Sequence, residues 1–130
     1  MSTSDPGPLA ALHDLYDTPP GLAECRLFSV HVDERDVSVT LRFETSALPD
    51  RPRPAWTGRP YNTFCFSLLF SGVAALRLRG LLADGESETS LRPTEDDRLA
   101  VTVAGPHRLI EFTAATATLA APEVRLHGSL

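Results

Sequence analysis

Histidines and cysteines are the side chains of this chain that could hold a metal ion or activate a nucleophile. Metal sites use them at short spacings, such as four residues apart on a helix or as a C-x2-C pair. The residues in question are scattered along the sequence, at His13, Cys25, His31, Cys65, His107 and His127. We therefore expect no metal site and no cofactor, and we expect both cysteines to be buried, reduced thiols.

His31 is the histidine whose setting most invites a catalytic reading, because it lies inside the apolar run RLFSVHV at residues 26–32. It shares one side of the expected strand with Ser29, which favours a solvent-side or half-buried histidine over a general base. Nucleophile and phosphate-binding motifs are missing, since GES at residues 85–87 does not complete G-x-S-x-G and there is no P-loop. These observations predict that the protein is not an enzyme.

Carboxylates gather at residues 33–36, 84–88 and 95–97. Acid–base catalysis needs a carboxylate in an environment that raises its pKa, whereas these groups lie where exposed hairpin tips are expected. Tips on a rigid sheet can vary without disturbing the core, and they often carry recognition.

The composition and charge of the chain limit the classes of partner that it can bind. The chain has 130 residues, a formal net charge of −5 and a pI near 5.3, which disfavours nucleic acid as a partner. Its N-terminus lacks the cationic start of a signal peptide, and no run approaches the ~20 apolar residues of a membrane span. We expect a cytoplasmic protein that binds neither nucleic acid nor membrane.

The elements that must position these residues are mostly strands. Leu9, Leu12 and Tyr16 form one stripe of a short helix, after a polar, flexible N-terminus at residues 1–8. From Cys25 onward the apolar period becomes two, the period of a β-strand. We expect residues 9–130 to form a single β-rich domain.

The first two strands should pair as a hairpin of residues 26–32 and 37–44, with residues 33–36 at its tip. In the first strand, alternation places Phe28, Val30 and Val32 on one face and Leu27, Ser29 and His31 on the other. In the second strand, the residues expected on the buried face are Val37, Val39, Leu41 and Phe43.

The rest of the chain continues this pattern. Residues 45–60 are rich in proline and predict a long loop, and the apolar residues 61–70 predict a central strand buried on both faces. Seven to eight short strands follow from the spacing of turns. The expected fold is mainly β: an antiparallel β-sandwich or curved sheet with one short N-terminal helix.

Four stretches taken together resemble a known family. They are LYDTPP (15–20), LFSVHVDERDVSVTLRF (27–43), LPDRPRPAW (48–56) and YNTFCFSLLFSGVAALRLRG (61–80). Over about residues 12–80 the chain resembles immunity protein family fifty, bacterial immunity proteins of polymorphic-toxin systems that are common in actinobacteria. Members usually have a glycine in the first hairpin turn, where this chain has Asp36 before Val37.

The resemblance implies a non-catalytic cytoplasmic inhibitor, monomer or homodimer, that binds and neutralises the effector domain of a cognate toxin. Together with the charge pattern, it makes the expected toxin-binding residues Asp33, Glu34, Asp36, Glu95, Asp96 and Asp97.

An alternative function stays open on the residues alone. The protein could be a small β-sandwich module that binds a metabolite, or an accessory protein of an operon. An apolar pocket for a metabolite would be lined by Trp56, Tyr61, Phe64 and Phe66, unless these aromatic residues form the hydrophobic core.

Overall fold

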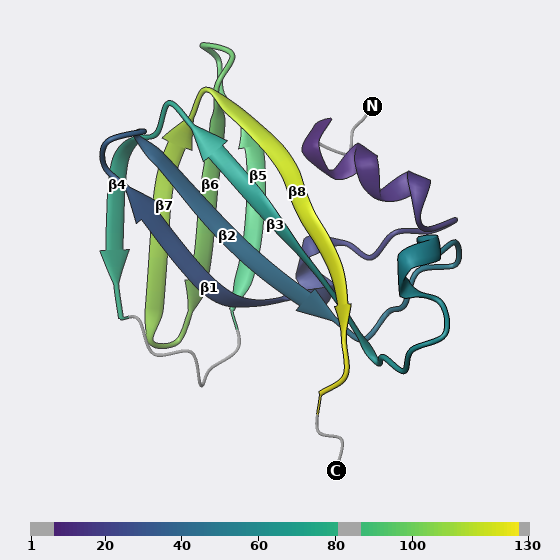
Figure 1. The fold of residues 1–130 in the computed structure, drawn as a ribbon. Helices are drawn as coiled ribbons and strands as arrows, with labels where there is room; N and C mark the ends of the chain where they lie inside the picture. The colour runs from purple at the N-terminus through teal and green to yellow at the C-terminus, as the bar shows by residue number, and fades with distance from the viewer. Residues whose placement is uncertain (1–6, 81–86, 128–130) are drawn as a thin grey trace.

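Two antiparallel four-stranded sheets pack face to face in the computed structural model, which describes residues 7–80 and 87–127 (Figure 1). The first sheet has the order β1-β2-β3-β8, with bounds Arg26–Asp33, Ser38–Thr45, Thr63–Ser71 and Thr116–Arg125. The second has the order β4-β7-β6-β5, with bounds Ala74–Arg79, Arg108–Ala114, Leu99–Gly105 and Glu88–Pro93. The eight strands of the described residues confirm the mainly β prediction and make the fold a sandwich.

The core lies between the two sheets, and strand alternation explains which residues enter it. Every second side chain of β2, β3, β6 and β7 points inward, because successive residues of a strand face opposite sides of its sheet. Phe70 of β3 and Phe112 of β7 join the sheets, with ring centroids 5.2 Å apart. The fully buried side chains include Val39, Leu41, Phe43, Phe64, Phe66, Leu68, Phe70, Val103 and Ile110.

The first hairpin forms as predicted, but its tip lies one residue later, at residues 34–37. The prediction that Val37 is on the buried face is wrong. Val37 is 50% exposed and has a φ of 53°, so it belongs to the turn rather than to β2. The left-handed backbone conformation takes its side chain out of the strand's alternation.

A β-bulge corrects the predicted faces of β1. The pairing with β2 shifts between Leu27 and Ser29, so Phe28 is an extra residue. Leu27 therefore lies opposite Phe43 on the core face and is buried, while Val30 lies opposite Leu41. The ring of Phe28 instead lies near Arg42, and the distance from the guanidinium carbon of Arg42 to the ring centroid of Phe28 is 5.6 Å. A single inserted residue moves the side chains of the preceding residues to the opposite face of the sheet.

The N-terminal segment and the proline-rich loop are held together by Arg51. The expected helix is a 3-10 helix, η1 (Gly7–Asp14), which lies beside β8 and buries Leu12 (Figure 1). The Arg51 guanidinium donates hydrogen bonds to the carbonyls of His13 (2.6 Å) and Tyr16 (2.9 Å) and to the Asp17 carboxylate. Two further 3-10 turns, η2 (Leu22–Glu24) and η3 (Pro54–Trp56), complete this region.

The aromatic residues considered for a metabolite pocket belong to the core. Phe64 and Phe66 are fully buried, and Trp56 packs edge-on against Phe64 at 6.0 Å between centroids. Tyr61, which is partly buried, packs against the same cluster. These contacts agree with the interpretation of the aromatic residues as hydrophobic core.

Both cysteines are buried, free thiols. Burial raises the pKa of the Cys25 thiol to about 12, and it also raises the pKa of Cys65. At neutral pH both are therefore protonated and behave as small apolar residues.

Among the described residues, no helix is both long and apolar enough to cross a membrane. Residues 1–6 of the expected flexible N-terminus lie outside the described residues, as do Asp84 and Glu86 of the carboxylate-rich stretch at 84–88.

Candidate functional site

Three turns of the sandwich meet at one end, and main-chain and side-chain hydrogen bonds tie them together. The Val73 N–H of the β3–β4 turn donates to the Val37 carbonyl of the β1–β2 turn at 3.0 Å. Arg98, directly after the β5–β6 turn, donates to the Gly72 carbonyl at 2.6 Å. The β1–β2 and β5–β6 turns therefore both contact the β3–β4 turn, at the upper end of the molecule in Figure 1.

The expected toxin-binding residues all lie in this region. Asp33, Glu34 and Asp36 belong to the β1–β2 turn and its edge, and Glu95, Asp96 and Asp97 belong to the β5–β6 turn. In these two turns six carboxylates accompany only two guanidinium groups, those of Arg35 and Arg98. We call residues 33–37, 72–76 and 94–98 the acidic end of the sandwich.

Asp33 shapes the first of the two acidic turns. Its carboxylate accepts hydrogen bonds from the Arg35 N–H at 3.0 Å and the Asp36 N–H at 3.3 Å. An aspartate bound in this way to the backbone just ahead is a common way to close a tight turn. Asp33 is therefore partly a structural residue, whereas Glu34 and Asp36 are exposed and free to meet a partner.

Thr94 organises the second acidic turn. Its hydroxyl donates a hydrogen bond to the Asp96 carboxylate and accepts one from the Arg98 N–H at 3.1 Å. The hydrogen bond from Thr94 is the main reason that the pKa of Asp96 is lowered, with a smaller contribution from Arg98. Asp96 therefore stays ionised throughout the neutral pH range.

An apolar groove of about 240 Å³ lies beside the first acidic turn, between the hairpin and the start of β4. Val32, Val37, Val73 and Leu76 line it, and Asp33 and Glu34 stand at its edge. Val32 and Val37 are among the exposed large apolar residues of the described chain, at 37% and 50%. An apolar centre with a charged rim is the usual anatomy of a protein-binding surface.

No local sequence pattern predicts this groove. The one signal available was Val37, a β-branched residue placed next to a charged tip, and it was assigned to the core. Val73 of the β3–β4 turn and Leu76 of β4 come almost forty residues later, so no local pattern relates them to Val37.

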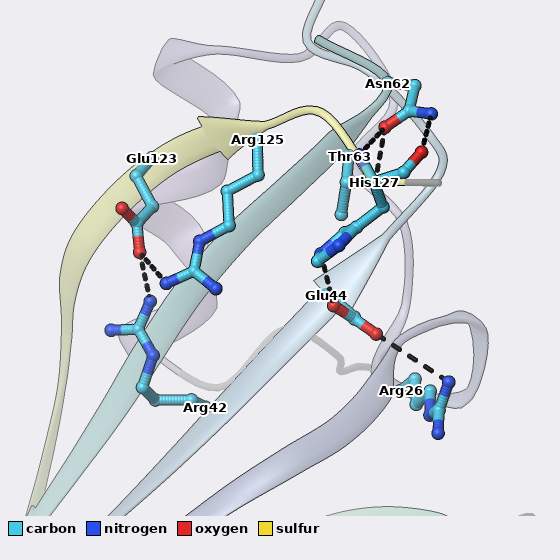
Figure 2. Close-up of polar contacts among 8 residues, drawn as sticks. All are labelled: Arg26, Arg42, Glu44, Asn62, Thr63, Glu123, Arg125 and His127. Atoms are coloured by element: carbon cyan, nitrogen blue, oxygen red, sulfur yellow. Dashed lines mark hydrogen bonds and ion pairs between the residues drawn. The ribbon is translucent and has the colours of Figure 1, made fainter. Parts of the chain in front are cut away.

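A second polar cluster lies on the outer face of the β1-β2-β3-β8 sheet (Figure 2). Glu123 of β8 pairs with Arg42 of β2 at 2.5 Å and with Arg125 at 3.0 Å, and Arg42 also donates to Ser67 of β3 at 2.8 Å. Because each charge already has its partner, this cluster joins neighbouring strands and offers no unpaired group to a ligand.

Glu44 forms a second set of contacts near the ends of β2 and β8 (Figure 2). It lies 3.3 Å from His127 and 3.9 Å from Arg26, and Asn62 donates to the His127 carbonyl at 2.9 Å. These contacts bind the end of β8 to β1 and β2.

The four histidines lie on separate elements of the described fold. His31 is exposed and lies opposite Thr40 across the hairpin. No group of three histidine, cysteine or acidic side chains is arranged to hold a metal ion among the described residues.

Comparison with known proteins extends the resemblance well beyond residue 80. A family model described as Immunity protein 50 matches residues 9–125, which include both acidic turns and every described strand. A search of curated proteins finds no match.

Proposed function

Because the chain belongs to the Immunity protein 50 family, we propose that it binds and neutralises a cognate bacterial toxin domain, in the cytoplasm and without catalysis. The observation that supports a specific binding surface is the meeting of two acidic turns on the β3–β4 turn, beside an apolar groove. We therefore propose the acidic end as the toxin-binding surface.

The two parts of this surface have different roles in the proposed complex. Carboxylates at Glu34, Asp36 and the β5–β6 turn attract a basic toxin surface and increase the rate of encounter. The exposed valines of the groove supply apolar area that is buried on contact, and this area provides most of the affinity. The hydrogen bonds that fix the turns reduce the entropy lost on binding.

Co-expression with a toxin gene identified in the neighbourhood of this gene tests the function. Cells that carry both genes should survive, and the two proteins should be recovered as a complex in a pull-down. If cells die as readily with this protein as without it and no complex forms, the immunity function is wrong.

A pair of matched variants tests the surface. Val37→Asp puts a charge into the groove and should weaken the complex by about a hundredfold, the loss typical of a hot-spot residue. Leu69→Asp puts the same charge on the outer face of β3, where Leu69 is 36% exposed, and should bind as the unaltered protein does. Equal affinity of the two variants would show that toxin binds elsewhere.

A further inference from the structure

The two sheets have four edge strands, β1, β8, β4 and β5, and the described elements protect them unequally (Figure 1). The 3-10 helix η1 lies beside β8, and η2 contacts β5. Among the described elements, no helix covers β1 or β4 in this way. An uncovered edge strand presents a row of unpaired N–H and C=O groups, which can bind a strand of another molecule. These two strands are therefore the edges at which another chain could pair.

β4 carries the features that discourage edge pairing. It is only six residues long, and it includes Arg77 and Arg79. Its pairing with β7 is irregular between Ala74 and Arg77, where Ala75 has a φ of 58°. Short length, charged side chains and bulges are devices by which proteins keep edge strands from pairing. β4 therefore offers little regular edge to another chain.

β1 lacks most of these features. It has eight residues and no proline, and its irregularity is confined to Phe28, so residues 29–33 form a regular strand. Between Arg26 and Asp33 it has no carboxylate or guanidinium group, and Val32 is 37% exposed. Outside the pairing with β2, no main-chain group of residues 26–32 makes a hydrogen bond to another described residue. The outer edge of β1 is therefore open and largely uncharged.

The charges at the two ends of β1 are opposite in sign. Arg26 begins the strand, and residues 33–36 at its far end carry three carboxylates and one guanidinium group. The Arg26 side chain is 67% exposed, and its described ion pair with Glu44 is loose, at 3.9 Å. Two copies of β1 that pair antiparallel place Arg26 of each copy beside the acidic turn of the other. A parallel pairing places like charges together.

We propose that the protein without toxin forms a symmetric homodimer, in which the outer edge of β1 pairs antiparallel with the same edge of a second copy. The pairing joins the two β1-β2-β3-β8 sheets into one continuous sheet through main-chain hydrogen bonds. Val30 and Val32, on the core side of the strand, then lie beside their counterparts and lose exposed apolar area.

Symmetry doubles the charge contact and limits the assembly. In a pairing centred near Val30, Arg26 of one copy lies beside Glu34 of the other, because the two residues are four positions before and after the centre. The twofold axis repeats this contact. Since the other described edges are covered or irregular, the assembly stops at two copies. The dimer does not rest on the proposed function, because it requires no toxin.

Sedimentation equilibrium of the full chain over a range of concentrations tests the dimer. The mean mass should rise from that of one chain to that of two, and no further. Val32→Lys puts a charge on the core side of the edge and should weaken dimerisation by at least about tenfold. Leu78→Lys is the matched control, because Leu78 is an apolar residue of similar exposure, 41%, on the other uncovered edge strand. It should dimerise within about twofold of the unaltered protein.

A charge exchange tests the antiparallel orientation. Arg26→Glu should weaken the dimer by about tenfold, because two attractive contacts become repulsive. Glu34→Arg in the same chain should restore the dimer to within about twofold, since each contact again joins opposite charges. Arg92→Glu makes the same change of charge at an exposed position of β5 and should dimerise as the unaltered protein does.

Thermal unfolding of each variant should show a cooperative transition, so that loss of the dimer is not loss of the fold. If Val32→Lys does not fold, the charge exchange decides, because Arg26 and Glu34 are exposed. The proposal is overturned if the mass stays that of one chain at every concentration or grows past two chains. It is also overturned if folded Val32→Lys and Leu78→Lys dimerise equally, or if Glu34→Arg does not restore the dimer of Arg26→Glu.

Discussion

At the scale of single residues, Val37 shows how one position can serve two demands. Its backbone lies in the left-handed region, where a β-branched side chain is strained, and its side chain lines the apolar groove of the acidic end. A glycine would satisfy the turn but would add nothing to the groove. In the proposed complex, the valine side chain contributes contact area that a glycine would lack.

Replacing Val37 by glycine should stabilise the fold. The left-handed conformation costs a non-glycine residue roughly 1–2 kcal/mol, and glycine loses about 0.5–1 kcal/mol more backbone entropy on folding, so the net gain is about 1 kcal/mol. Val37→Ala trims the same methyl groups but keeps the Cβ atom, so it should gain little. Urea unfolding of both variants measures the difference, and equal stability of the two would contradict strain at this turn.

At the scale of elements, the first hairpin is the clearest link between pattern and packing. Val39, Leu41 and Phe43 alternate along β2 and are fully buried, and each lies opposite an apolar residue of β3. The bulge at Phe28 breaks the same rule in β1, because it adds a residue that has no partner on β2. The side chains of β2 therefore alternate as predicted, whereas those of β1 on the two sides of the bulge do not.

Leu41→Ala should destabilise the protein by about 2–5 kcal/mol, the cost of a cavity at a fully packed site. Leu69→Ala removes the same atoms from the outer face of the adjacent strand, at a 36% exposed position, and should cost about 1 kcal/mol or less. Chemical denaturation of the two variants provides the measurement. A loss at Leu41 no larger than that at Leu69 would mean that the centre of the first sheet is not packed as described.

At the scale of the whole molecule, the carboxylates of two turns far apart in the sequence are brought together at one end of the sandwich. Six of them lie at the acidic end. Such a cluster orients an approaching charged partner over distances comparable to the Debye length, about 8 Å at physiological salt.

Charge reversal at the acidic end should therefore act on the rate of toxin association. Glu34→Lys and Asp36→Lys should each slow association several-fold at low salt and reduce its dependence on salt concentration, while dissociation changes little. Glu88→Lys is the matched control, since Glu88 begins β5 at the other end of that strand from the acidic turn. Association kinetics at two salt concentrations measure the effect, and an equal reduction in the control would rule out steering by this end.

The sequence by itself determined the strands, the long proline-rich loop and the identity of the charged tips. These features are local, because a period-two alternation of apolar residues and the turn-forming residues between strands can both be recognised within a short stretch of sequence. For this reason the tip of the first hairpin was predicted to within one residue, and the central strand, expected at residues 61–70, was found at residues 63–71.

Only the tertiary structure decided which tips meet and what lies between them. Val37 and Val73 line the same groove, Arg98 donates a hydrogen bond to the Gly72 carbonyl, and the end of β4 pairs with β7 about thirty residues later in the chain. The alternation of apolar and polar residues also did not predict the bulge at Phe28 or the left-handed turn conformation of Val37. Such features depend on the pairing of strands far apart in sequence, and pairing is set by the packing of the two sheets as a whole.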